Sequence, residues 1–243
     1  MGLVERLDFT PRLKQESQRQ AYQEKKSHKK WADIDRYLVD VLVPSDPALE
    51  SALQSSEAAG LPLHSVSPNQ GKFLMLLAKT VGARSILEIG TLGGYSTIWL
   101  ARALAPGGKV TTLEANPRHA KVALVNIACA GVADRVDLRL GSALDTLPTL
   151  EDEAPYDFIF IDADRVNIPN YFKWALKLAR QGSLIVVDNV IRHGAIINQD
   201  DSTSQSIRQF FNLAATERRV SVTAMQTVGI KGHDGFAIAH VEA

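Results

Sequence analysis

From Ser85 onward, short apolar runs alternate with helical stretches, and this alternation restricts the fold more than any other feature of the sequence. Continuous apolar runs such as FIFI and LIVV are typical of parallel strands that are buried on both faces. The sequence therefore predicts an α/β protein with a doubly wound, Rossmann-like sheet. The expected strands are 85–90, 109–114, 135–140, 156–163 and 183–189, and the expected helices are 94–104, 117–132 and 169–182.

Two more β-like runs lie near the C-terminus, at 219–228 and 234–241. Residues 229–233 between them form a linker that is too short for a parallel crossover. We therefore expect these two runs to pair antiparallel at one edge of the sheet.

The N-terminal part of the chain predicts accessory helices. A helical pattern begins at Trp31, Asp46 can cap a second helix, and Ser67 can cap a third. Residues 1–30 carry eight basic and four acidic side chains, an excess of four positive charges. They form either a solvated, partly helical extension or an arm over an active site or partner subunit. We expect a single domain at 31–243.

Composition excludes several classes of protein. Lys plus Arg and Asp plus Glu both number 27, so no basic excess indicates nucleic-acid binding. No apolar stretch is long enough for a membrane span, and the N-terminus does not resemble a signal peptide, so the cytoplasm is the expected location. Cys129 is the single cysteine. It can form neither an intramolecular disulfide nor a structural zinc site, and we expect it to be a buried apolar residue.

A glycine-rich turn follows the first expected strand. Gly90, Gly93 and Gly94 lie between that strand and a helix, whose free N–H groups can bind a nucleotide-like ligand. Glu114 ends the next strand, 20 residues after Gly94, an offset at which a carboxylate can bind ribose hydroxyls. The pair predicts an adenosine ligand. The glycine spacing differs from G-x-G-x-x-G, which argues against a nicotinamide enzyme.

Oxygen-bearing side chains end two later strands. Asp162 follows FIFI, and Asp188 with Asn189 follows LIVV. Consecutive parallel strands are expected to be neighbours, so these side chains should converge at the carboxyl edge of the sheet. Two carboxylates and an amide oxygen suit Mg²⁺, Ca²⁺ or Mn²⁺, whereas the absence of His and Cys from the set argues against zinc. The alternative is that both aspartates only cap the helices that follow.

These motifs, in this order, resemble one enzyme family. LEIGTLGGYS, the acid of TLEANP, GSALDTLP, FIFIDADR and VVDNVIRHG are similar to the cation-dependent, S-adenosylmethionine-dependent O-methyltransferases of the catechol and caffeoyl-CoA type. The resemblance covers about Trp31 to the C-terminus. It implies a seven-stranded sheet whose last strand is antiparallel, and a homodimer. It also implies methyl transfer to a phenolic hydroxyl of a catechol-like small molecule, assisted by Mg²⁺.

The resemblance also implies roles for individual residues. Glu88, Gly90 and Ser96 would hold the methionine end and backbone side of S-adenosylmethionine, and Val66 would contact it by its backbone. Glu114 would bind the ribose, Ser142 and Ala143 the adenine, and Asp164 the methionine amino group. Asp162, Asp188 and Asn189 would hold the cation.

Arg165 departs from the family pattern, because relatives carry a lysine there that serves as the general base. A guanidinium stays protonated and cannot accept a proton. Arg165 therefore either stabilises the phenolate and positions the substrate, or pairs with an acid and faces solvent. His193 is a candidate substitute base, or an incidental loop residue. Two alternatives for the whole protein stay open: a metal-independent small-molecule methyltransferase, and a catalytically silent S-adenosylmethionine-binding protein.

Overall fold

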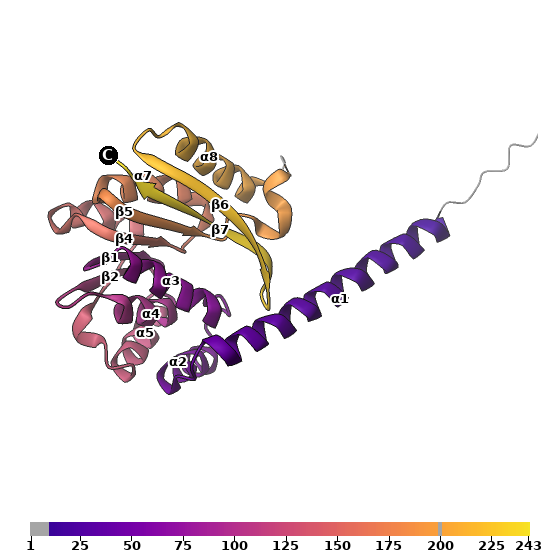
Figure 1. Ribbon diagram of the computed structural model, residues 1–243, viewed down its shortest axis with the longest axis horizontal. Helices are drawn as coiled ribbons and strands as arrows, with labels where there is room; N and C mark the ends of the chain where they lie inside the picture. The colour runs from indigo at the N-terminus through magenta and orange to yellow at the C-terminus, as the bar shows by residue number, and fades with distance from the viewer. Residues whose placement is uncertain (1–9, 199–200) are drawn as a thin grey trace, which may run out of the picture.

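The computed structural model describes residues 10–198 and 201–243, with side chains from residue 25 onward except at 202 and 203. Within these residues, seven strands form one sheet in the order β3-β2-β1-β4-β5-β7-β6 (Figure 1). The strands are β1 (Ser85–Ile89), β2 (Lys109–Glu114), β3 (Val136–Leu140), β4 (Tyr156–Ile161), β5 (Ala179–Asp188), β6 (Val220–Gly229) and β7 (Gly232–Val241).

Helices cover both faces of this sheet. They are α1 (Thr10–Leu42), α2 (Pro47–Ala58), α3 (Pro68–Thr80), α4 (Tyr95–Ala103), α5 (Pro117–Cys129), α6 (Ala143–Thr146), α7 (Ile168–Leu178) and α8 (Ser202–Thr216). Short 3₁₀ turns are η1 (Ala133–Arg135), η2 (Leu147–Glu153), η3 (Arg165–Asn167) and η4 (Arg192–Ile197).

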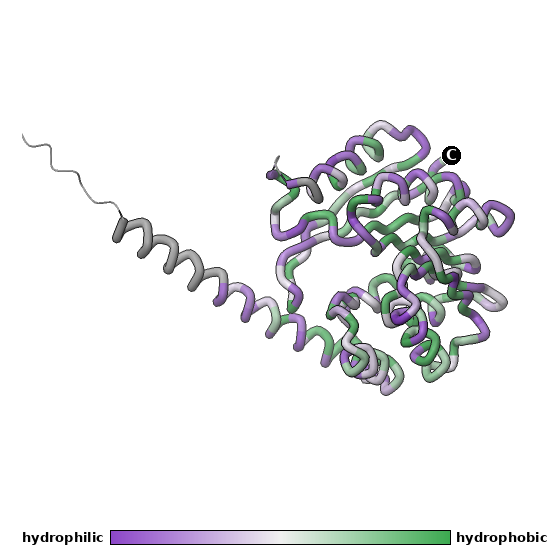
Figure 2. The backbone as a smooth tube through the Cα atoms, turned by 180° about the vertical axis from the view of Figure 1, so that it is seen from behind, coloured by the Kyte–Doolittle hydropathy of each residue, from purple (hydrophilic) through white to green (hydrophobic). Residues whose placement is uncertain are grey.

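Alternate residues of the central strands point into two separate hydrophobic cores. Phe158 and Phe160 of β4 face the core beneath α3, α4 and α5, whereas Ile159 and Ile161 face the core beneath α7 and α8. A strand whose neighbouring residues point to opposite faces needs apolar residues at every position when both faces are covered. Figure 2 shows the resulting apolar centre, with hydrophilic segments toward the outside.

The structure confirms the predicted doubly wound α/β class. Strands β1 to β5 pair in parallel, and β7 pairs antiparallel with both β5 and β6. The caps are confirmed as well: the Asp46 carboxylate accepts from two backbone N–H groups of α2, and the Ser67 hydroxyl accepts from Gln70 N. No helix in the described part of the chain is long and apolar enough to cross a membrane.

Helix α1 runs without a break across residue 30, the predicted limit of the N-terminal extension, of which residues 1–9 lie outside the described residues. Its C-terminal part meets the β6–β7 hairpin, where Ile230 N donates to Asp35 Oδ2 at 2.7 Å. The rest of α1 projects away from the sheet (Figure 1).

Two local predictions were wrong. Cys129 is exposed rather than buried, because it ends α5 on the side that faces away from the core. The predicted helix at 169–182 ends at Leu178, and residues 179–182 belong to β5. Ala179 pairs with Tyr156, and the Arg180 guanidinium binds the Asp157 carboxylate, so contacts with β4 override the helical pattern.

The turn after β1 lies directly against the end of β4. Gly90 adopts a φ of +104°, and a Cβ added to it would lie 2.2 Å from the carbonyl oxygen of Asp162. The space that the missing side chain leaves is therefore filled by the neighbouring chain. This close approach brings the glycine turn and the predicted metal site together.

We expect Gly90→Ala to reduce the free energy of unfolding by about 2–4 kcal/mol, because it adds overpacking to an unfavourable φ. Gly131→Ala is the matched control, since Gly131 has a φ of +69° with no atom within 4 Å of an added Cβ. It should cost about 1 kcal/mol. Urea unfolding measures both, and equal losses would show that the Gly90–Asp162 contact carries no packing constraint.

Candidate active site

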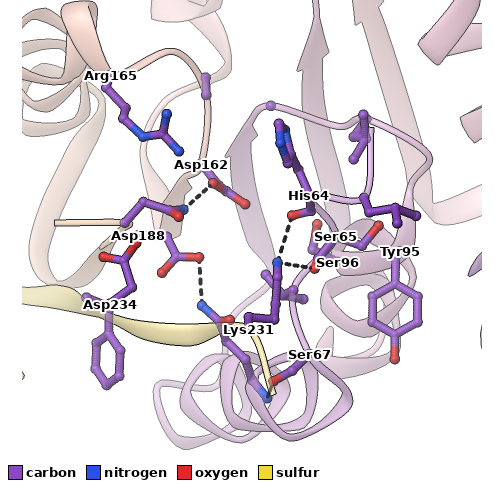
Figure 3. Close-up of a pocket in the computed structure, with 18 of the residues that line it drawn as sticks. His64, Ser65, Ser67, Tyr95, Ser96, Asp162, Arg165, Asp188, Lys231 and Asp234 are labelled. Carbon is purple, nitrogen blue, oxygen red and sulfur yellow. Dashed lines mark hydrogen bonds between the residues drawn. The ribbon is translucent and has the colours of Figure 1, made fainter. Parts of the chain in front are cut away.

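A cavity of about 940 Å³ opens at the edge of the sheet where β1, β2, β4 and β5 end (Figure 3). The turns after these strands line it, together with residues 63–70 before and within α3 and the tip of the β6–β7 hairpin. Ligand pockets usually measure about 300–1,000 Å³. The cavity therefore has room for a nucleoside and a second small molecule together.

Glu88 lies inside β1 and is fully buried. Its Oε2 accepts hydrogen bonds from the hydroxyls of Thr97 and Thr112, whereas its Oε1 is buried without a partner. Burial raises the pKa of Glu88 to about 7, against the lowering effect of the neighbouring hydroxyls. Glu88 does not line the cavity, so its unpaired Oε1 lies behind the side chains that do.

Glu114 ends β2 at the wall of the same cavity and is 8% exposed. Its Oε2 accepts from Leu92 N in the glycine turn, and its Oε1 accepts from Asn116 N, both at 2.8 Å. These bonds fix the carboxylate. Its Oε2 keeps a free lone pair, whereas its Oε1 also lies 3.3 Å from His119 Nδ1. The glycine turn and the acid that follows it thus form one unit, as expected for a ribose site.

Not all of the other predicted cofactor residues line the cavity. Val66, Gly90, Ser96 and Ala143 line the cavity, whereas Ser142 is exposed and does not line it. Asp164 lines the cavity but accepts hydrogen bonds from the Tyr171 hydroxyl and from Asn167.

The predicted metal residues converge. Asn189 has a φ of +62°, and its Nδ2 donates to Asp162 Oδ1 at 2.9 Å. Burial raises the pKa of Asp162, and the negative charge of Asp188 raises it further. Burial also raises the pKa of Asp188, although Gln70 Nε2 donates to its Oδ2 at 2.7 Å. Two carboxylates that repel each other in a partly dry cavity form a set that a cation would stabilise.

No group of three or more His, Cys, Asp and Glu side chains in the described residues is arranged to hold a metal ion. The predicted set contains only two carboxylates beside an amide. A cation at this place therefore stays a prediction.

The two predicted catalytic side chains besides Asp162 also line the cavity. The Arg165 guanidinium points toward Asp162 (Figure 3), and its Nε is buried without a partner. Burial lowers the pKa of Arg165, and the charge of Arg192 lowers it further. His193 is exposed, with a φ of +53° in the turn after Asn189.

Sequence reasoning missed three residues of the site. Gln70 binds Asp188, and Lys231 Nζ donates to the carbonyls of His64 and Ser65 (Figure 3). Asp234 Oδ1 accepts from the backbone N–H groups of Ile191 and Arg192. Each contact joins segments that are far apart in the chain. Local patterns carry no signal for them, apart from the motif KGHDGF, which contains both Lys231 and Asp234.

Comparisons with known proteins show which family the chain belongs to. A model of the O-methyltransferase family matches residues 45–239. A catechol O-methyltransferase of Mycobacterium tuberculosis is 54% identical over 210 residues, which are 86% of this chain and 95% of that protein. The crystal structure of an O-methyltransferase from Bacillus cereus in complex with SAH is 56% identical, with a TM-score of 0.87, and the match covers 88% of this chain and all of that one.

A third relative is an O-methyltransferase from Streptomyces achromogenes that is involved in tomaymycin synthesis. Its crystal structure in complex with SAM is 47% identical to this chain, with a TM-score of 0.86, and the match covers 89% of this chain and 99% of that one.

Glu88 predicts a pH dependence of stability. Its pKa is about 7 in the folded protein and near 4.5 in the unfolded chain, so the folded state binds more protons between these values. The contribution of Glu88 to stability therefore falls as the pH rises through this range, by on the order of 1–3 kcal/mol without ligand. Glu88→Gln should remove this part of the dependence.

Urea unfolding at about pH 5 and about pH 7.5 tests this expectation, with Glu57→Gln at an exposed position as the control. An unchanged pH dependence in Glu88→Gln would contradict it.

Proposed function

Because the chain belongs to the O-methyltransferase family, we propose that it transfers the methyl group of S-adenosylmethionine to a phenolic hydroxyl of a catechol-like small molecule, assisted by a divalent cation. One observation carries the proposal. Asp162 and Asp188, two carboxylates whose pKa values are raised, share a cavity with the Gly90 turn and Glu114. The name of the Mycobacterium tuberculosis relative supports a catechol as the substrate class.

The proposed cofactor residues would contact different parts of S-adenosylmethionine. Glu114 would bind the ribose, and Glu88 with its unpaired Oε1 would lie at the methionine end beside Gly90 and Ser96. Val66 and Ala143 would close the cavity around the cofactor. Asp164 already accepts hydrogen bonds from Tyr171 and Asn167, so it would bind the methionine amino group with a lone pair that these bonds leave free. Ser142 does not line the cavity, so it would have to move to contact the adenine.

Asp162, Asp188 and Asn189 would hold the cation, for which Mg²⁺ is the first candidate and Ca²⁺ and Mn²⁺ the others. A hard cation at this place supplies Lewis acidity, which lowers the pKa of a phenol from its ordinary value near 10. By holding the cation, the carboxylates would also fix the orientation of the two hydroxyls of an ortho-diol, and orientation by itself accelerates a transfer reaction strongly. The hydrogen bond from Gln70 Nε2 would keep the Asp188 carboxylate in position to hold the cation.

Arg165 would stabilise the negative charge that develops on the phenolic oxygen. It cannot remove the proton, since a guanidinium stays protonated. His193 lines the same cavity and carries an imidazole that can accept a proton. His193 is therefore the proposed acceptor of the phenolic proton.

A homodimer, which the resemblance implies, also stays a prediction. Large apolar side chains are exposed on the C-terminal part of α1 and on the β6–β7 hairpin that it contacts, namely Ile34, Tyr37, Val41, Leu42, Met225, Val228 and Ile230. Apolar surface of this kind is typical of an interface between subunits. Sedimentation of the full chain as a 26.5 kDa monomer would argue against it.

Methyl transfer from labelled S-adenosylmethionine to catechol tests the function directly. We expect a chelator to lower turnover at least about 100-fold, with recovery on added Mg²⁺ and no change in the binding of S-adenosylhomocysteine. Asp188→Asn should behave like the chelated enzyme. Turnover that is insensitive to chelator would favour the metal-independent alternative. Cofactor binding without turnover on any phenol would favour the silent protein.

Arg165→Lys tests the role of the arginine. If Arg165 only supplies positive charge, the lysine should preserve or raise kcat, and the pH profile should gain a limb because an amine can also accept the proton. Steady-state kinetics across pH measures both. A loss of activity would contradict this role and indicate that the substrate needs the planar, bidentate guanidinium.

A further inference from the structure

Two arginines flank the proposed diol site. Arg165 lies three residues after Asp162, and Arg192 lies three residues after Asn189. Because β4 and β5 are neighbours, both arginines follow adjacent strands at the same edge of the sheet, and both line the cavity. The charge of Arg192 is close enough to lower the pKa of Arg165.

Neither guanidinium has an ion-pair or hydrogen-bond partner within the described residues, in contrast to Arg102, Arg139, Arg180 and Arg219. Burial and the charge of Arg192 lower the pKa of Arg165, although the charges of Asp234, Asp162 and Asp188 raise it, so a further anion beside the two arginines would be favourable.

The acids near Arg165 act on it by their charge, but none forms an ion pair with either arginine within the described residues. Asp234 Oδ1 accepts from the N–H groups of Ile191, Arg192 and Gly235, which fixes the backbone that carries Arg192. Asp162 and Asp188 would face the cation. Arg165 points toward Asp162, where the diol would bind (Figure 3). Arg192 is therefore the arginine of the cavity to which the proposed reaction gives no role.

We propose that the substrate is an anionic catechol, and that Arg192 binds a carboxylate on its ring or side chain while the ortho-diol lies between Asp162, Asp188 and Arg165. This inference rests on the proposed function and names its substrate class. A guanidinium presents two parallel N–H donors that match a carboxylate, and such charge-assisted pairs are strong in a partly dry cavity.

The positive charge near the site suits one carboxylate rather than a chain of phosphates. Lys231, the remaining long cation of the described lining, already donates to the carbonyls of His64 and Ser65. A polyphosphate would need several free cations, whereas the described residues offer Arg192 beside Arg165.

Three catechols of matched size test the proposal: one with a carboxylate para to a hydroxyl, its methyl ester, and the corresponding primary amine. For the wild-type chain we expect kcat/KM to be about tenfold higher for the carboxylate than for the ester, and lowest for the amine. Arg192→Gln should remove the preference for the carboxylate and leave the ester nearly unchanged. Arg218→Gln is the matched control, because Arg218 is exposed and does not line the cavity.

Equilibrium binding of the carboxylate and the ester to the protein saturated with S-adenosylhomocysteine and Mg²⁺ gives the second readout. The carboxylate should bind about tenfold more tightly to the wild-type chain and to Arg218→Gln, but no more tightly than the ester to Arg192→Gln. Equal use of the carboxylate and the ester by the wild-type chain, or a preference that survives Arg192→Gln, would overturn the inference while the proposed function stands. If none of the three catechols is methylated, the proposed function fails and the inference with it.

Discussion

The site depends on the close approach of two strand ends. Gly90 after β1 touches the backbone of Asp162 after β4, and only a residue without a side chain can do so at a φ of +104°. One strand carries the turn that we propose binds a nucleoside, and the other carries the aspartate that would meet a cation. Their contact sets the distance between the two halves of the reaction, because both lie on a sheet that is packed on each face and resists deformation.

The same region of the sheet holds buried carboxylates that Lys231 and Arg165 offset only in part. Glu88, Asp162 and Asp188 all have raised pKa values, caused first by burial. Amides from Gln70 and Asn189 donate to the two aspartates but bring no positive charge. Such an arrangement lowers the stability of the chain alone and favours ligands that are cationic. The ammonium group of S-adenosylmethionine and a divalent cation both meet this requirement.

Much of the fold could be predicted, since apolar runs, capping residues and glycines act locally. The FIFI and LIVV strands, the caps at Asp46 and Ser67 and the final antiparallel pair are confirmed. Helix α8 was missed, and the early start of β5 was predicted as helix, because contacts with β4 decide it.

The place of a cavity residue was predictable where it ends a strand, as Glu114 and Asp188 do, or directly follows one, as Asp162 does. Gln70 and Lys231 were missed because their partners, 118 and 166–167 residues away, come near only after folding. Ser142 follows a strand as well, yet it turns outward as the first residue before α6.

We propose that one cavity places a cofactor and a cation on adjacent strand ends. The most direct measurement is a crystal structure of the protein with S-adenosylhomocysteine and Mn²⁺, using the anomalous signal of manganese to locate the ion. The account predicts one strong anomalous peak within coordination distance of Asp162, Asp188 and Asn189, with the ribose on Glu114. An ordered cofactor with no peak at these three residues, or with the ion held elsewhere, would contradict it.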